Sequence, residues 1–328
     1  MTRVRSPLDA MENADRAWRA GRTHAVAILP STFAVIDKQL GGGLRAYELT
    51  LLGGAQGLGA TPFALQAARA VAVAGDSALY VCFEHREQDV PVWRLAMELG
   101  LRGGLEGTTS SQLRSFLAGG SSRLDGLPER LAGDEGGGAA LRWMVAYAPR
   151  LHLDTMGCAR TTVADLRALV EAAAPARPLV VVVDYLRKLR VDNDPADEAE
   201  RVTEVAEKPR DLALLVDVPV FALATADKPG LDGRTRLQHL RGSTALAYGA
   251  DVALLMKNTR AIVAGHHLMI GTANAVQYRP WVVCTAEKNH GGRNGVDLEF
   301  RKQFAHGHFD VLGQVVAEQL VDDRVHVA

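Results

Sequence analysis

The chain of 328 residues is 48% hydrophobic and 23% charged, which is typical of a soluble globular protein with a sizeable core. Its formal net charge of −1 excludes a global field that would attract nucleic acid or an anionic membrane, so such binding requires local basic patches. The 3 cysteines are scattered and odd in number, which predicts reduced thiols and not a disulfide framework or a metal site. No apolar run reaches membrane-spanning length and residues 1–22 lack the core of a signal peptide, so we expect a cytoplasmic protein without membrane partners.

Residues 1–30 predict an N-terminal arm. Apolar residues recur at helical spacing over residues 6–21, which predicts one short helix that Gly21 ends. These positions are Leu8, Met11, Ala14, Ala17 and Trp18. The apolar stripe is narrow, so the helix must bury it against the body of the protein or against a neighbouring subunit. A flexible leader with a partial helix is the alternative.

A predicted strand, a glycine-rich turn and a predicted helix follow one another early in the chain. They are the apolar run 49–52, the stretch 53–59 and the helix-forming stretch 63–71. In this context backbone N–H groups and a helix N-terminus cradle phosphates. The spacing from Gly54 to Thr61 fits the phosphate-loop pattern G-x-x-x-x-G-K-[ST] at every position but one, because Ala60 stands where the lysine belongs. The residues predicted to hold phosphates are Gly54, Gly57, Gly59, Ala60 and Thr61.

The rest of the chain alternates predicted strands and helices. Strands are expected at 77–83, 151–154, 179–184, 218–224 and 250–256, with an antiparallel pair at 281–287 and 296–300. Helices are expected at 89–99, 162–173, 196–215 (interrupted by Pro209) and, briefly, within 309–328. The glycine-rich and serine-rich residues 102–138 predict a partly mobile insertion with one short helix at about 111–117. The alternation predicts an α/β fold, with a mostly parallel sheet flanked by helices, in one domain over residues 31–328.

Two acidic residues end predicted strands. In a phosphate-loop enzyme the loop threonine, here Thr61, ligates Mg²⁺, and an aspartate at the end of a later strand holds the metal through water, a role that suits Asp184. Glu84 ends the strand after the loop helix and is placed to polarise an attacking water. Taken singly, either acid is equally well explained as a solvated strand exit or a helix cap. Two such acids after a near-complete phosphate loop favour the catalytic interpretation.

Several further segments form a recognisable set. They are Ser-Thr-Phe-Ala-Val-Ile-Asp at 31–37, Phe-Ala-Leu at 63–65, Cys-Phe-Glu-His at 82–85, Val-Asp-Tyr-Leu at 183–186, Leu-Arg-Gly-Ser-Thr at 240–244 and Gly-Ala-Asp-Val at 249–252. In this order they resemble the C-terminal RecA-like motor domain of the bacterial replicative DnaB-type DNA helicases, from about Ser31 to Phe304. The triple glycine at 41–43 is also similar to RadA-like and KaiC-like ATPases.

The resemblance implies a RecA-like P-loop fold, ATP and Mg²⁺ as cofactors, a homo-oligomer such as a ring, and single-stranded nucleic acid as a partner. It implies that Arg241 and Gly242 belong to an inward loop along the nucleic-acid backbone, with Arg234 and Arg236 in the basic stretch before it. Solvated arginines on loops are the alternative, because these loops lack aromatic residues that stack on bases. By analogy, helix 6–21 stands where the family has a linker helix that packs on the next subunit.

The departures from the family pattern concern groups around the phosphates. Ala60 replaces the lysine that neutralises the β- and γ-phosphates, and Thr225 falls near the glutamine that senses the γ-phosphate. The family's Lys-x-Arg, which one subunit supplies to its neighbour's ATP, aligns with Lys288 and His290, and Arg293 is a candidate substitute. A trans arginine is worth roughly a thousandfold or more in rate. These losses therefore predict weak nucleotide binding and little hydrolysis.

The resulting hypothesis is a degenerate DnaB-like ATPase homologue, a pseudoenzyme that acts as an oligomeric scaffold or regulator and binds single-stranded nucleic acid. Its action either responds to nucleotide or is independent of it. The alternative is an active ATP-dependent DNA translocase or helicase with an unusual or engineered phosphate loop. A third hypothesis is a protein-interaction module whose loop binds nothing or a different anion. Thr225 and His290 depart from the pattern independently of Ala60, which favours natural degeneration.

Overall fold

The structure is a computed structural model. It describes residues 6–20, 28–86, 89–103, 107–118, 136–154, 161–173, 178–189, 210–211, 213–214, 218–226, 235–240, 246, 248–258 and 280–315. Three of the predicted nucleic-acid residues, Arg234, Arg241 and Gly242, lie outside these ranges, as does most of the helix expected at 196–215.

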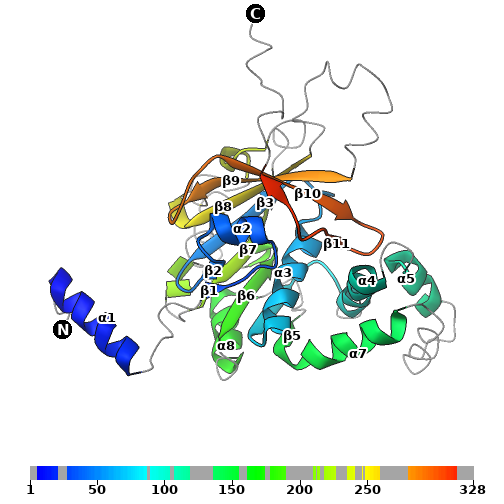
Figure 1. Ribbon diagram of the computed structural model, residues 1–328, viewed down its shortest axis with the longest axis horizontal. Helices are drawn as coiled ribbons and strands as arrows, with labels where there is room; N and C mark the ends of the chain where they lie inside the picture. Colours follow the sequence, from blue (N-terminus) through cyan, green and yellow to red (C-terminus); the bar gives the residue numbers. More distant parts are fainter. Residues whose placement is uncertain are drawn as a thin grey trace, which may run out of the picture.

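A central sheet organises the described part of the chain (Figure 1). Its ten strands run in the order β11-β10-β9-β8-β3-β7-β6-β4-β5, with β12 paired to β10. The parallel strands are β3 (Leu49–Gly54), β4 (Ser77–Cys82), β5 (Leu151–Asp154), β6 (Leu179–Asp184), β7 (Val220–Thr225) and β8 (Val252–Asn258). The antiparallel strands are β9 (Trp281–Asn289), β10 (Val296–Gln303), β11 (His308–Phe309) and β12 (Gln314–Val315). The predicted α/β fold, with a mostly parallel sheet and a closing antiparallel hairpin, is confirmed.

Helices cover both faces of the parallel strands, and this explains the composition of the central ones. All of β6 is buried, and its sequence is Leu-Val-Val-Val-Val-Asp. Val180 and Val182 belong to the core on the side of α3 (Ala60–Ala74). Val181 and Val183 belong to the core on the side of α8 (Val163–Ala173). A run of branched apolar residues suits a strand that is buried on both faces.

Three phenylalanines tie the start of α3 to distant parts of the chain. Phe33, which precedes α2 (Ala34–Gln39), stacks on Phe63 of α3 with ring centroids 3.9 Å apart and an interplanar angle of 6°. Phe300 of β10 meets both rings edge-on, at 5.3 and 5.7 Å. The three side chains are at most 1% exposed. The first turns of α3 are therefore fixed by packing against both α2 and the antiparallel strands. Next to α2, β1 (Ile28–Leu29) and β2 (Leu44–Arg45) form a separate antiparallel pair.

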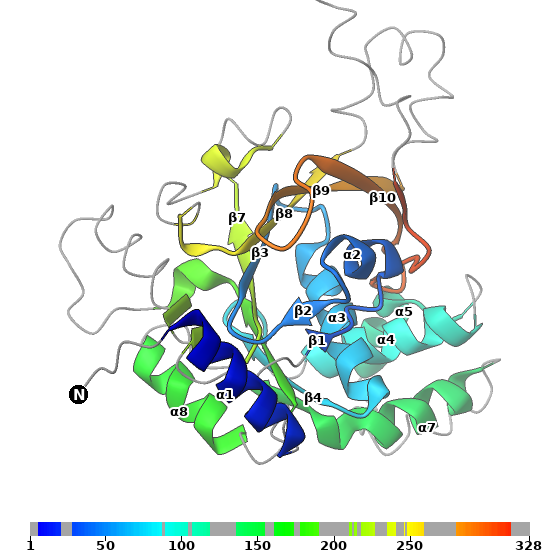
Figure 2. The same ribbon diagram turned by 60° about the vertical axis from the view of Figure 1, so that its left-hand side comes forward.

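A group of helices lies beside α3 and extends the molecule on that side (Figure 2). It consists of α4 (Asp89–Gly103), α5 (Ser110–Ala118) and α7 (Gly137–Tyr147). The fully buried carboxylate of Glu98 in α4 accepts hydrogen bonds from the guanidinium of Arg69 in α3 and from the Tyr147 hydroxyl, the latter at 2.8 Å. Burial raises the pKa of Tyr147 to about 12, so its hydroxyl stays a donor. The paired carboxylate holds α4 and α7 to α3.

The helices expected at 6–21, 89–99 and 111–117 are confirmed as α1 (Pro7–Arg19), α4 and α5. Figure 1 shows α1 standing apart from the sheet, and a division of the chain at residue 30 stays a prediction. The sequence does not predict α7, because glycines 136–138 stand at its start; Gly136 has φ +83° and the helix begins directly after it.

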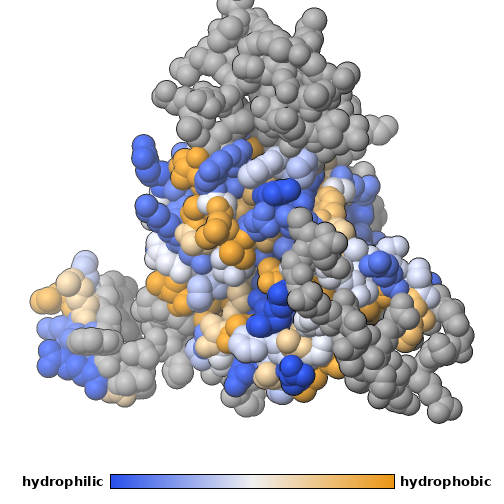
Figure 3. All heavy atoms as spheres, turned by 45° about the vertical axis from the view of Figure 1, so that its right-hand side comes forward, coloured by the Kyte–Doolittle hydropathy of each residue, from blue (hydrophilic) through white to orange (hydrophobic). Residues whose placement is uncertain are grey.

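Residues 309–315 contain the end of β11 and all of β12, so the short helix expected within 309–328 does not lie there, and the rest of that stretch is outside the described residues. In the ranges that the structure covers, no helix combines the length and hydropathy that a bilayer crossing requires. Figure 3 shows hydrophilic and hydrophobic residues interspersed over the described surface of one face.

We predict that Phe63→Ala lowers the free energy of unfolding by about 4 kcal/mol, because the side chain leaves a cavity between Phe33 and Phe300. Val73→Ala, at a 37% exposed position of the same helix, is the matched control and changes the value by less than about 0.5 kcal/mol. Urea unfolding followed by circular dichroism measures both. Equal midpoints for the two variants would show that the aromatic stack is not what fixes α3.

Candidate functional site

The phosphate loop has the geometry that its sequence predicts. β3 ends at Gly54, residues 55–59 form the turn, and α3 begins at Ala60. Gly57 and Gly59 have φ +80° and +95°, which L side chains rarely adopt. A Cβ at Gly59 would also lie 2.7 Å from the Phe304 ring and 2.8 Å from the Phe309 ring. The loop is thus packed against aromatic side chains that follow β10.

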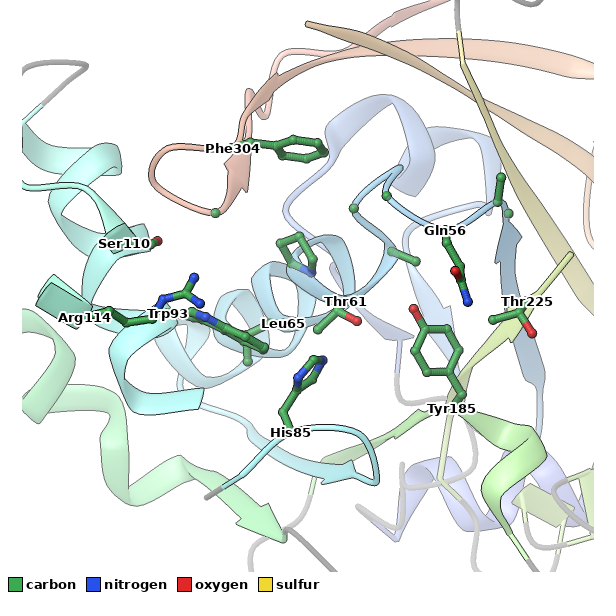
Figure 4. A pocket seen from close by; sticks show the side chains of 17 residues that line it. Gln56, Thr61, Leu65, His85, Trp93, Ser110, Arg114, Tyr185, Thr225 and Phe304 are labelled. Atoms are coloured by element: carbon green, nitrogen blue, oxygen red, sulfur yellow. The ribbon is translucent and has the colours of Figure 1, made fainter. Parts of the chain in front are cut away.

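A cavity of about 470 Å³ opens in front of this loop, within the range of small-molecule sites (Figure 4). The lining residues from the loop and α3 are Gly54, Ala55, Gln56, Gly57, Gly59, Ala60, Thr61, Pro62 and Leu65. The others are His85, Trp93, Ser110, Arg114, Tyr185, Thr225, Phe304 and Gly307. The cavity lies at the carboxyl end of the parallel strands, where ligands of open α/β sheets bind.

The predicted metal residues are brought together. The Thr61 hydroxyl lies 3.4 Å from Asp184 Oδ1, a long hydrogen bond in which Thr61 donates. The Tyr80 hydroxyl donates to Asp184 Oδ2 at 2.6 Å. Burial raises the pKa of Asp184 to about 6, although both hydrogen bonds oppose this shift. A threonine hydroxyl beside a carboxylate is an oxygen donor set of the kind that Mg²⁺ prefers, so these residues fit the metal.

Glu84 does not face the cavity in this structure. Its Oε1 lies 3.3 Å from Arg187 Nη2 and 4.0 Å from Lys188 Nζ, and both residues belong to the 3₁₀ turn after β6. It is not among the described residues that line the cavity. In this arrangement the predicted water-polarising carboxylate is paired with cations and does not line the cavity, although its charge acts on Asp184.

The remaining candidates near the loop are neutral. Ala60 lines the cavity with a methyl group where the family pattern has an ammonium. Thr225 lines it from the end of β7, which pairs with Gly54. Arg114 and His85 are the basic side chains of the lining within the part of the chain that the structure covers, and both come from outside the loop.

The residues predicted to act on a neighbour's ATP lie at the other end of the strands from the cavity. They are Lys288, His290 and Arg293. Asn289 pairs with Val252 and Val252 with Thr50, so the turn after β9 sits at the amino end of β3. There His290 Nδ1 lies 3.3 Å from Asp251 Oδ1, while Lys288 Nζ donates to the Tyr248 carbonyl at 3.4 Å and Arg293 bonds through its carbonyl to Gln39. The loop and these residues are at opposite ends of β3, so one chain does not bring them together.

Of the predicted nucleic-acid residues, Arg236 is described. It is exposed and begins the 3₁₀ turn Leu237–His239. The Leu240 side chain at the end of this turn packs on Gly53 of β3, since a Cβ there would lie 2.7 Å from it. Arg236 precedes Leu240 by four residues, so the chain at this point runs close to the carboxyl end of β3. Arg236 itself does not line the cavity.

Sequence reasoning missed several residues of the site. Tyr185 directly follows Asp184, and Tyr80 has the one side-chain hydroxyl group in the buried strand segment 78–82. Both residues could therefore have been predicted as part of the site from their sequence positions. Trp93, Ser110 and Arg114 come from α4 and α5, and only the tertiary fold brings them to the loop.

Comparisons with known proteins agree with this architecture. No protein-family model matches the chain. The replicative DNA helicase DnaB of Treponema pallidum (strain Nichols) is 26% identical over 141 residues, which cover 43% of this chain and 28% of that protein. The matched segment is thus well under a third of the curated relative.

Two solved structures share the fold. The first, described as an ATPase domain, aligns with a TM-score of 0.70 and 16% identity, over 93% of this chain and 99% of that one. A DnaB-like replicative helicase, solved in a study of its interactions with primase, aligns with a TM-score of 0.67 and 16% identity, over 87% of this chain and 63% of that one. The chain thus shares the RecA-like fold of DnaB-like helicase ATPase domains, and part of it is distantly similar in sequence to a DnaB helicase.

We predict that Asp184→Asn stabilises the metal-free protein above pH 7 by about 3 kcal/mol, because ionising the buried carboxyl costs the native state. The folded-state pKa lies above the unfolded value, so wild-type stability falls as pH rises from about 4 to about 6 and the variant lacks this fall. Urea unfolding in EDTA at pH 8 and pH 4.5 measures the difference. A variant less stable than the wild type at pH 8 would contradict the assignment.

Proposed function

We propose that this DnaB-like domain binds a nucleoside polyphosphate with Mg²⁺ weakly, hydrolyses it slowly, and acts as an oligomeric scaffold or regulator. One observation carries the proposal. The cavity keeps its backbone cradle and the Thr61–Asp184 pair, yet residue 60 presents a methyl group to the phosphates.

Binding is supported by parts of the site that do not depend on the lysine. Backbone N–H groups at a glycine-rich turn and a helix N-terminus attract phosphate through fixed dipoles. Thr61 and Asp184 supply oxygen ligands on the side of α3 and β6, and a bound Mg²⁺ would neutralise phosphate charge there. Weak binding is expected because the charge of the missing ammonium is not replaced within the loop.

Slow hydrolysis is supported by two features together. The ammonium that would stabilise charge developing on the transferred phosphate is absent. Glu84, the candidate for orienting water, pairs with Arg187 and Lys188 in place of facing the cavity. Catalytic contacts are often long before a substrate binds, so the loss of the lysine weighs more than the position of Glu84.

Oligomerisation is supported by the separation of the two groups of phosphate-directed residues. Lys288, His290 and Arg293 lie at the amino edge of the sheet, so they reach bound phosphates only in a neighbouring copy. A ring of identical subunits presents one edge of each chain to the cavity of the next. For single-stranded nucleic acid the described support is the exposed Arg236, and Arg234, Arg241 and Gly242 belong to the same proposal from sequence alone.

The second candidate is an active ATP-dependent translocase. The retained Thr61–Asp184 pair favours it, as does the presence of one arginine, Arg114, in the cavity wall.

We predict that calorimetric titration with Mg²⁺–ATP gives a Kd tighter than about 1 mM, because the backbone cradle is intact. Thr61→Val removes the hydroxyl at nearly constant volume and so tests the contribution of the metal. It should weaken nucleotide binding in Mg²⁺ and leave nucleotide binding in EDTA unchanged. A folded protein that releases no heat would contradict the proposal and indicate a vestigial loop.

We predict that Ala60→Lys raises ATP affinity about tenfold through a charged hydrogen bond to phosphate, without bringing turnover to helicase rates. Ala60→Gln, of similar length and without charge, is the control. Phosphate release is measured with and without single-stranded DNA. Turnover of about 1 per second or faster in Ala60→Lys would favour the translocase.

A further inference from the structure

The cavity extends past the phosphate loop to a wall that phosphate binding does not use. In Figure 4, Arg114 and Trp93 lie at one end, Gln56 and Thr225 lie at the other, and Leu65 and Thr61 lie between them. The wall at the Arg114 end comes from α4 and α5. If the phosphates of a ligand occupy the loop, the organic part of that ligand must lie at one of these two ends.

The chemistry of the two ends differs. Trp93 and Leu65 line the cavity on the α5 side with an aromatic and an aliphatic side chain. At the other end, Gln56 and Thr225 flank the Tyr185 ring, which adjoins the Thr61–Asp184 pair and so belongs to the metal side of the site. The His85 ring meets the Trp93 indole edge-on, with centroids 4.4 Å apart at 77°. A planar ring gains from an aromatic wall by stacking, so the α5 end suits a nucleobase.

The position of α5 is set by the turn between β10 and β11. The Ser110 N–H donates to the Ala305 carbonyl at 2.8 Å, and a His306 ring nitrogen lies 2.8 Å from the Gly107 carbonyl. Ser110 and Arg114 are four residues apart and so lie on one face of α5, which is the face toward the cavity.

Among the described lining residues on the α5 side, the side chains offer few fixed hydrogen-bond acceptors. The Ser110 hydroxyl and the His85 ring donate or accept, so neither discriminates between bases. Arg114 carries five N–H donors and no acceptor.

We propose that the α5 end of the cavity selects the nucleobase, and that Arg114 favours an oxopurine, such as guanine or hypoxanthine, over adenine. This inference rests on the proposed function, because it requires phosphates in the loop. An oxopurine edge offers O6 and N7 as two acceptors to a guanidinium, whereas adenine places an amino donor beside N7. Arg114 is exposed, so we expect the lower part of the range for such a pair, a preference of about tenfold.

The test is calorimetric titration of the full chain with GDP, IDP and ADP in Mg²⁺, and with inorganic tripolyphosphate. GDP and IDP should bind about tenfold tighter than ADP and equally to each other, because hypoxanthine keeps O6 and N7. Arg114→Met should lower the affinities for GDP and IDP to about that for ADP, because it removes the guanidinium donors. Arg114→Lys should keep part of the preference, since lysine also donates to O6 and N7. Arg167→Met, on α8 at the other face of the sheet, is the matched control and should keep the preference.

Three results would overturn the inference. Equal affinities of the wild type for GDP and ADP would do so while leaving nucleotide binding, and the proposed function, in place. A loss in Arg114→Met that is equal for all three nucleotides and for tripolyphosphate would assign Arg114 to the phosphates. Absence of binding by every probe to a folded wild-type protein would overturn the proposed function together with this inference.

Discussion

The cradle depends on aromatic packing behind the first turn of α3. Phe63 stacks on Phe33 and meets Phe300 and Phe309 edge-on, and Gly59 lies against the rings of Phe304 and Phe309. None of these contacts involves the side chain of residue 60, which points to the cavity side. The path of the loop is therefore encoded in the hydrophobic core. A methyl group in place of an ammonium changes what the loop holds without changing how the loop folds.

The charge balance of the site is set by a buried carboxylate. Asp184 is fully buried, and the hydroxyls of Tyr80 and Thr61 offset part of the cost of ionising it. The family-type cation is missing from the loop, and Arg187 and Lys188 direct their charge to Glu84. The arrangement thus favours a ligand that brings its own cation, as a nucleotide does with Mg²⁺, over a bare polyphosphate.

The fold and the loop were predictable because both follow from local patterns. The branched run of β6 and the glycine spacing from Gly54 to Thr61 specify a buried parallel strand and a phosphate turn without reference to the rest of the chain. Glu84 follows β4, as the sequence indicates, but its pairing with Arg187 is a tertiary contact across two strand ends. The wall with Trp93 and Arg114 was not predicted, because these residues gain meaning only when α4 and α5 pack beside α3. The helix α7 was not predicted from the sequence because the glycines at its start also favour turns.

The buried pair of Arg69 and Glu98 has a consequence for the size of whatever enters the cavity. Thr61 and Arg69 are eight residues apart on α3, about 12 Å along the helix axis. Arg69 anchors α4 through Glu98, and α4 carries Trp93. The backbone rise of α3 therefore sets the distance from the phosphate turn to the point where Arg69 anchors α4, and with it the span to the aromatic wall. A molecule that touches both must match a preset length, so the cavity discriminates by reach as well as by charge.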